Sequence, residues 1–161
     1  MSTTLQYREL APVTEGKRIY RYVTTGVNTC RLTGRLARHP DCNLYTADGV
    51  LRAWIRAGHL YCSESYAWNG SSPKRYIGGN MLGKWLGTPD FPKTRRASLF
   101  HDVLFQFAEV GRYDMADCNY QFLTLMEREG FKLAQQYYEA VEMFGQKYYG
   151  HDQQGVRITL L

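Results

Sequence analysis

The chain has 161 residues and a mass of 18.7 kDa, a length that fits one domain with a substantial hydrophobic core. Hydrophobic residues make up 44% and charged residues 22%, proportions that exclude a disordered or low-complexity chain. The formal net charge of +5 is mild and spread along the sequence, so a specific nucleic-acid ligand is not predicted.

The sequence predicts neither a transmembrane segment nor a secretory signal. No apolar run approaches the ~18 residues that a membrane helix needs. The first ten residues, MSTTLQYREL, hold no apolar stretch typical of a secretory signal. We therefore expect the chain to act in a cytoplasm.

The cysteines are scattered, and in a cytoplasmic chain such cysteines are usually reduced thiols. The alternative is a zinc site built from two H-x-x-C pairs, His39–Cys42 and His59–Cys62. The second pair lies in a strand-like segment, where residues three apart point to opposite faces, so we favour thiols. The four cysteines are Cys30, Cys42, Cys62 and Cys118.

The first part of the chain, residues 1–65, reads as strands and turns. Residues 18–27 and 44–65 alternate β-branched or aromatic residues with polar ones, as half-buried strands do. Asp48-Gly49 lies between two strand-like runs and predicts a hairpin. Residues 66–92 are rich in Gly, Ser and Pro and read as a connector.

From residue 93 to residue 150 the pattern becomes helical. Helices are predicted over residues 93–109, 113–129 and 131–149, with Pro92 near the first start and Gly130 after the second end. Residues 156–161, VRITLL, predict a terminal strand. The expected fold is therefore α+β in a single domain (1–161): a small antiparallel sheet followed by a three-helix subdomain.

Two polar residues interrupt the most apolar helix. Residues 99–107 are hydrophobic on nearly every face, which indicates a buried helix, yet His101 and Asp102 lie at their centre. A buried carboxylate must be paired, or it takes up a proton. In an antiparallel helix hairpin, Asp117 and His101 lie at similar distances from the connection between the helices, and we expect their side chains to meet.

The expected contact between His101 and Asp117, with Asp102 beside it, allows two interpretations. In the first, His101, Asp102 and Asp117 bind a divalent metal such as Zn, Mn or Fe, or form a histidine base oriented by a carboxylate. In the second, His101 and Asp117 are a buried polar pair that fixes the register of the hairpin. Asp102 then pairs with a nearby arginine: Arg95, Arg96 or Arg112.

The segment YAWNGSSP, residues 66–73, is the second candidate. As a functional loop it would line the helical cleft, with Ser72 a nucleophile if His101 lies close in space. As an ordinary turn, its Asn and Ser side chains would bond to the local backbone over the Trp68 ring. The candidate substrate-binding residues are Trp68, Asn69, Ser71 and Arg112.

These motifs occur in an order that resembles a family of mostly bacteriophage-encoded proteins, domain-of-unknown-function family 1353. The resemblance covers roughly residues 50–150 and consists of W-N-G-S-S-P, H-D-x-L-F, R-x-x-x-A-D and A-V-E-x-F-G. It implies that His101, Asp102, Asp117 and residues 69–72 occupy the family's signature positions.

The sequence departs from the family pattern at three positions. Asn69 stands where Asp is usual, which removes a charge and a strong ligand for a hard metal. Phe105 stands where Tyr is usual, which removes a hydroxyl, and Tyr120 stands where Phe is usual. The first two departures favour a site of reduced catalytic competence over a full enzyme.

The resemblance implies a phage origin, and three functions remain open. The favoured one is a virion, tail or assembly protein with a hydrolase-like His-Asp site, bound to other phage structural proteins or to further copies of itself. The second is a hydrolase of peptidoglycan or lipid, and the third an inhibitor of a host factor. The expected location is the host cytoplasm and the virion.

Overall fold

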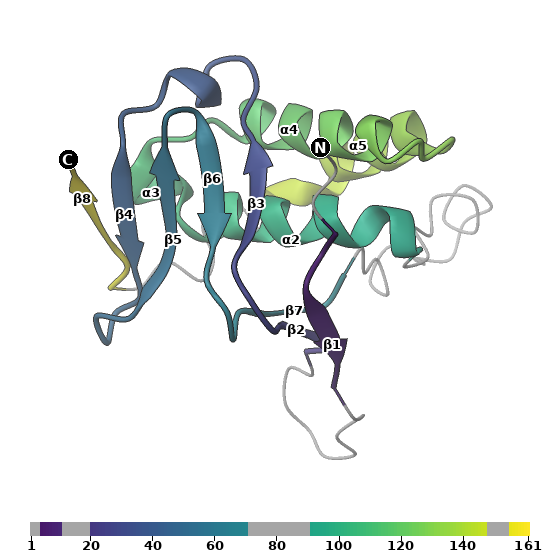
Figure 1. Ribbon diagram of the computed structural model, residues 1–161. Coiled ribbons are helices and arrows are strands. Elements are labelled where there is room, and N and C mark those ends of the chain that lie inside the picture. Colours follow the sequence, from purple (N-terminus) through teal and green to yellow (C-terminus); the bar gives the residue numbers. More distant parts are fainter. Residues whose placement is uncertain (1–3, 11–19, 71–90, 148–154) are drawn as a thin grey trace.

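The computed structural model describes residues 4–10, 20–70, 91–147 and 155–161 and has the expected α+β arrangement (Figure 1). Strands come first along the chain and helices follow. The strands are β1 (Tyr7–Glu9), β2 (Tyr22–Thr24), β3 (Asn28–Arg31), β4 (Cys42–Tyr45), β5 (Leu51–Arg56), β6 (His59–Cys62), β7 (Ala67–Trp68) and β8 (Arg157–Leu160), with a 3₁₀ turn, η1 (Leu36–Arg38), before β4.

The strands form two antiparallel sheets in place of the one small sheet that the sequence predicts. The three-stranded sheet has the order β1-β2-β7, and the five-stranded sheet has the order β3-β6-β5-β4-β8. The segment Ala67–Trp68 therefore forms a strand inside the predicted connector. The rest of that connector, residues 71–90, lies outside the described residues.

Two hairpin turns shape the five-stranded sheet. Asp48-Gly49 joins β4 to β5 as predicted, and Gly49 takes a left-handed φ of +83°. Ala57 and Gly58 join β5 to β6 with φ values of +46° and +72°, the pattern of a two-residue primed turn. A Cβ on Gly58 would lie 3.2 Å from the Ala37 carbonyl oxygen, so this position also lacks room for a larger residue.

The terminal segment forms a strand, as expected. Strand β8 pairs with β4 in antiparallel register, with Leu44 opposite Ile158. It lies at one edge of the five-stranded sheet (Figure 1). The half-buried Ile158 packs against the core.

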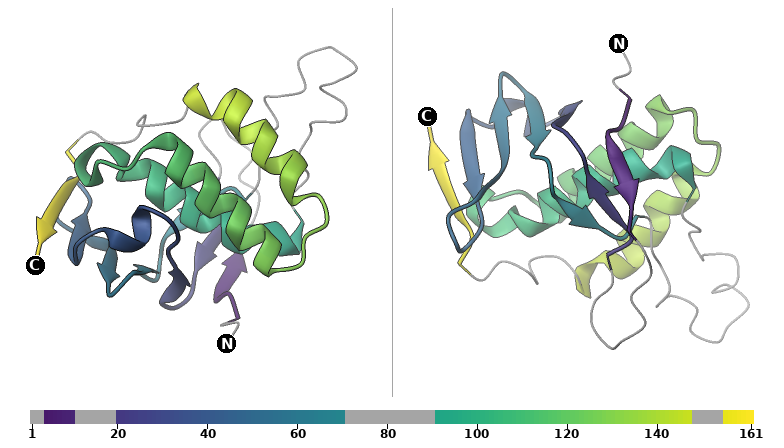
Figure 2. Two further views of the ribbon diagram at one scale, coloured as in Figure 1. Left: turned by 90° about the horizontal axis from the view of Figure 1, so that it is seen from above. Right: turned by 60° about the horizontal axis from the view of Figure 1, so that its bottom comes forward.

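Helices cover one face of this sheet (Figures 1 and 2). Pro92 is the first residue of its helix, and the left-handed Gly130 follows the end of another, as predicted. The first predicted helix is divided in two near Phe107, and the third is shorter than expected. The helices are α2 (Pro92–Gln106), α3 (Ala108–Gly111), α4 (Met115–Arg128) and α5 (Ala134–Phe144), with a final 3₁₀ turn, η2 (Gly145–Lys147).

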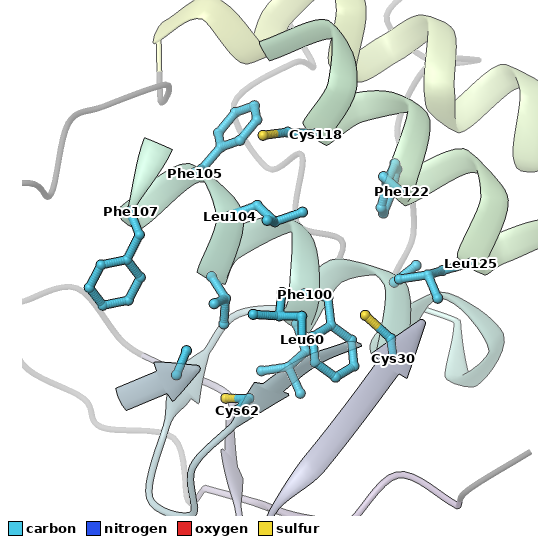
Figure 3. Close-up of a cluster of buried hydrophobic side chains, with 14 of the residues drawn as sticks. Cys30, Leu60, Cys62, Phe100, Leu104, Phe105, Phe107, Cys118, Phe122 and Leu125 are labelled. Atoms are coloured by element: carbon cyan, nitrogen blue, oxygen red, sulfur yellow. The ribbon is translucent and has the colours of Figure 1, made fainter. Parts of the chain in front are cut away.

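The core lies between the sheet and helices α2 and α4 (Figure 3). Alternate strand residues such as Cys30, Leu60 and Ile55 point inward from neighbouring strands and are almost fully buried. From the helical side, Phe100 and Leu104 are completely buried against them. One cluster thus joins the strand-forming and helical parts of the chain.

All four cysteines are buried free thiols, as the sequence suggests. Burial raises the pKa of the Cys30 thiol to about 12 and shifts the pKa of Cys62 in the same direction. These thiols are therefore protonated at neutral pH and pack as small hydrophobic groups. No helix among the described residues is long and apolar enough to span a bilayer.

Candidate functional site

The centre of the candidate site is His101, in the middle of α2. Its side chain is 9% exposed and lies between α2 and α4. The ring centroid of Phe105, one turn later on α2, is 4.1 Å from the imidazole centroid, and that of Phe122 on α4 is 5.0 Å away. Figure 3 shows these two phenyl rings in the space between the helices. The imidazole therefore lies in an apolar environment with few polar partners.

One hydrogen bond connects the imidazole to the neighbouring helix. His101 Nε2 lies 2.7 Å from Asn119 Oδ1, and Asn119 is completely buried. Asn119 Nδ2 in turn donates to Glu142 Oε1 on α5, at 3.0 Å. We call these three residues the His-Asn-Glu relay; it joins α2, α4 and α5.

The relay fixes the protonation state of each nitrogen in the imidazole. An ionised carboxylate only accepts hydrogen bonds, so Glu142 requires the amide NH₂ of Asn119 to face it. The amide oxygen must then face His101, and Nε2 must carry a proton to donate to that oxygen. Nδ1 is left with the lone pair, and no described residue forms a hydrogen bond with it.

Burial also keeps the ring neutral. It lowers the pKa of His101 from 6.5 to about 4, and the hydrogen bond with Asn119 only partly opposes this effect. At neutral pH the side chain is therefore a neutral imidazole in one tautomer, with an unprotonated Nδ1. Such a group can accept a proton from water or from a hydroxyl group.

The structure places Asn119, and not Asp117, opposite His101. Helix α2 ends at Gln106, and α4 begins at Met115. Counted from these ends at about 1.5 Å per residue, His101 lies about 7.5 Å and Asn119 about 6 Å from the connection, whereas Asp117 lies only about 3 Å from it. The expected partner of His101 is therefore wrong by two residues along α4. The reason is that the connection between the two helices is longer than the sequence suggests.

Asp117 and Arg112 lie nearer the connection. The half-buried Asp117 is in the first turn of α4, next to Cys118; burial raises the pKa of the Cys118 thiol, and the charge of Asp117 adds to this effect. Arg112 is exposed and ends α3 in the left-handed conformation, with a φ of +54°. The hydrogen bond of the imidazole is made with Asn119 and with neither of these residues.

Asp102 faces a different element from His101. Residues 66–68, which include β7, lie along α2: the Trp68 Nε1–H donates to Ser98 Oγ at 3.2 Å, and the Tyr66 hydroxyl donates to Gln106 Oε1 at 3.0 Å. Asp102 is half-buried and lies four residues from both Ser98 and Gln106, so it shares this face of α2. His101 and Asp102 therefore border the site from two sides, as their 100° separation on the helix requires.

The loop candidates are only partly described. Trp68 is completely buried, and its ring centroid lies 5.3 Å from that of Tyr22, so its indole packs in the core. Asn69 follows directly, and its Oδ1 atom is buried without a hydrogen-bond partner among the described residues. Ser71 and Ser72 lie outside the described residues. The Trp68–Ser98 bond brings the start of this loop within one helical turn of His101 on α2.

The described residues contain no group of three His, Cys, Asp or Glu side chains arranged to hold a metal ion. His39 Nδ1 lies 3.8 Å from Cys42 Sγ. On β6, however, Cys62 points into the core, while His59, three residues earlier on the same strand, points to the opposite face. The two H-x-x-C pairs thus do not converge. The chemistry that the observed geometry supports is acid–base chemistry at His101.

The sequence analysis missed two of the three relay residues. Asn119 lies on the buried face of α4 with Phe122, Leu123 and Met126, a spacing of i, i+3, i+4 and i+7. The sequence does contain a signal for Asn119: it is an amide among apolar residues on one helix face, and a buried amide needs a polar partner. Glu142 is a half-buried acid on α5, and its sequence position carries no comparable signal.

Comparisons of the chain with protein-family models, with curated proteins and with solved structures find no match.

Proposed function

We propose that the protein is a phage protein of the virion or its assembly, and that its helical part carries a hydrolase-like acid–base site centred on His101. The observation that supports the site is the hydrogen-bond chain from His101 Nε2 through the Asn119 amide to Glu142, from which we infer a proton on Nε2 and a basic Nδ1. The substrate class that we propose is a component of the cell envelope, either peptidoglycan or lipid.

In this proposal His101 Nδ1 takes a proton from a water molecule or from a serine of the adjacent loop, Ser72 being the first candidate. Asn119 holds the ring in place through the Nε2–H bond. The Glu142 carboxylate, bonded to the same amide, favours the positive charge that forms on the ring. Both are positioning residues.

The test is hydrolysis of two probes, dye-labelled peptidoglycan and fluorescent phospholipid vesicles. One of them should be hydrolysed by the wild-type protein. His101→Gln should lower the rate at least about 100-fold with an unchanged circular dichroism spectrum, because proton transfer by a positioned base contributes about that factor. His151→Gln, a histidine to which we assign no role, is the matched control and should keep the full rate.

The pH profile separates catalysis from a structural role. The acid limb of kcat/KM should lie near pH 4, the pKa of His101, and Glu142→Gln should lower kcat/KM, because the amide carries no charge to favour the imidazolium. Turnover that persists in His101→Gln, or an acid limb near pH 6.5, would contradict the proposed base. Absence of turnover on both probes would remove the hydrolase part of the proposal.

The assembly role is supported by a separate observation on β8. This strand is at the edge of its sheet, and no described strand pairs with its outer side. Leu160 and Leu161 are 60% and 68% exposed there. An edge with apolar residues can add a strand from another chain. We propose that β8 pairs with a second copy or with a neighbouring phage protein.

The assembly role has its own test. Light scattering after size exclusion should show an oligomer for the wild type and a smaller species for Leu160→Lys, and the chain should occur in purified particles at a fixed copy number. A wild-type monomer that is absent from particles would contradict this role. Co-purification with a host protein in that case would favour the third function, inhibition of a host factor.

A further inference from the structure

The five-stranded sheet has one face that the described helices leave open (Figures 1 and 2). Side chains alternate along each strand, and the strand registers align the outward positions from β3 to β8. One row runs directly across the sheet and consists of Thr29, Tyr61, Trp54, Asn43 and Thr159. We call this surface the open sheet face.

The open sheet face is strongly basic. The five strands supply eleven outward positions; four of them are arginines and one is a histidine, and none carries Asp or Glu. The whole chain, in contrast, has 20 Lys and Arg against 15 Asp and Glu. Four of the 20 Lys and Arg residues lie at these outward strand positions, and no acidic residue lies there, so this face of the sheet carries a net positive charge. These basic residues are Arg31, Arg52, Arg56, His59 and Arg157.

Two of these arginines are held against the sheet. Arg56 donates to the Cys42 carbonyl oxygen at 2.8 Å and to Asn43 Oδ1 at 2.6 Å. Arg52 donates to the Ser65 carbonyl oxygen at 3.2 Å. Their charges are therefore fixed in place beside the aromatic residues. Arg31 and Arg157, at the two outer strands, are exposed.

Aromatic rings lie between these charges. Trp54 and Tyr61 are directly paired across β5 and β6, and their rings are stacked with centroids 5.5 Å apart and an interplanar angle of 3°. Both rings are half-exposed on this face. Tyr45 extends the aromatic surface onto β4, where its hydroxyl accepts a hydrogen bond from Asn43 Nδ2 at 3.1 Å.

We propose that the open sheet face binds single-stranded nucleic acid. Exposed, preorganised aromatic rings on a sheet stack with unpaired bases, and each stacked base contributes about 1–3 kcal/mol. Guanidinium groups on both sides of the rings supply the matching positive charge for phosphates.

The combination of rings and charge selects this partner over others. In a duplex the bases are already stacked inside the helix, so they cannot also stack on Trp54 and Tyr61. An acidic protein would match the arginines but not the stacked pair. Four interstrand spacings of about 4.8 Å make the face roughly 19 Å wide, enough for a short run of nucleotides.

The test is fluorescence anisotropy with a fluorescein-labelled 12-nucleotide oligothymidine and a duplex of equal length, at several salt concentrations. The wild type should bind the single strand at least about tenfold more tightly than the duplex. Trp54→Leu should weaken single-strand binding about tenfold or more through the lost stacking, with circular dichroism verifying the fold.

Charge variants give an independent result. Arg31→Gln combined with Arg157→Gln should lower the slope of log K against log salt by about 1.4, since each phosphate contact on a single strand contributes about 0.7. The matched control combines Arg8→Gln with Lys132→Gln, an equal change of charge at exposed positions outside the five-stranded sheet, and should leave the slope unchanged.

Three outcomes would overturn the proposal. They are absence of binding at low salt, equal binding of single strand and duplex, and equal weakening by the control and the Arg31/Arg157 variant. Tighter binding of poly-glutamate than of the oligonucleotide would assign the face to an acidic protein partner instead. None of these outcomes bears on turnover at His101, so the two proposals fail separately.

Discussion

Asn119 determines the chemistry of His101. The amide has two different ends, and Glu142 fixes which end faces the imidazole. A carboxylate at position 119 would instead accept from Nε2 without any such constraint and would add a charge beside the ring. The neutral amide allows a low pKa at His101 together with a defined tautomer.

The low pKa of His101 predicts a specific loss of stability in acid. The folded value is about 4 and the ordinary value 6.5, so between these pH values the unfolded chain binds a proton that the folded chain does not. The free energy of unfolding should therefore fall as the pH drops below about 6.5. At pH 5 this loss amounts to about 2 kcal/mol for His101 alone.

Urea unfolding at pH 7.5 and pH 5.0 measures this loss. The wild type should lose about 2 kcal/mol more than His101→Gln between the two pH values, because the remaining titrating groups are common to both proteins and cancel. An equal loss in both proteins would show that His101 titrates normally in the folded state.

At the residue scale the sequence predicts which side chain needs a partner, but not which partner it has. His101 lies within an apolar helix, and its burial follows from that pattern alone. Its partner depends on where α2 ends and α4 begins, and a boundary shift of two residues replaces Asp117 with Asn119. Helix ends are the least certain part of a sequence-based prediction.

At the element scale, strong local signals predict the structure well. The Asp48-Gly49 turn, the proline at the start of α2 and the strand over residues 157–160 all follow from the sequence. The Ala57-Gly58 turn was missed because alanine rarely takes a left-handed φ. Ala57 and Gly58 both take positive φ values because the register of β5 with β6 leaves only two residues for the turn.

A buried amide links helix α4 to the end of strand β3. Gln121 is completely buried; its Oε1 accepts from the Thr33 backbone N–H and from the Thr33 hydroxyl, both at 2.8 Å. Its Nε2 donates to the Arg31 carbonyl oxygen at 3.0 Å. These bonds satisfy the backbone where β3 ends, so α4 and β3 are held in one relative position.

Replacement of this amide should be costly. Gln121→Met keeps most of the side-chain volume but leaves the Thr33 groups without their acceptor, so we expect a loss of roughly 2–4 kcal/mol in the free energy of unfolding. Gln135→Met, the same change at an exposed position of α5, is the control and should stay within about 0.5 kcal/mol of the wild type. Similar values for both variants would contradict the role of Gln121.

At the scale of the whole molecule, the five-stranded sheet has two different faces. Its inner face is a core shared with α2 and α4, and its outer face carries arginines and aromatic rings. The sequence shows the alternation within each strand, but strand order decides which side chains become neighbours. The basic surface therefore follows from the strand order β3-β6-β5-β4-β8, which the sequence alone does not predict.

The shared core predicts that the chain unfolds in one step. The three tryptophans, Trp54, Trp68 and Trp85, all precede α2 in the sequence, so their fluorescence reports on the first part of the chain and on the contact of Trp68 with α2. Circular dichroism at 222 nm reports mainly on the helices. In urea the two transitions should coincide, because neither part has a core of its own. Separate midpoints would show two independently folding units.

The most direct test of the account is the nitrogen NMR spectrum of His101, assigned by its loss in His101→Gln. We expect a neutral ring with the proton on Nε2 at pH 7 and still at pH 5, because Asn119 and Glu142 fix the tautomer and burial disfavours the charge. A proton on Nδ1, or a charged imidazolium at pH 6, would contradict the relay and with it the proposed base.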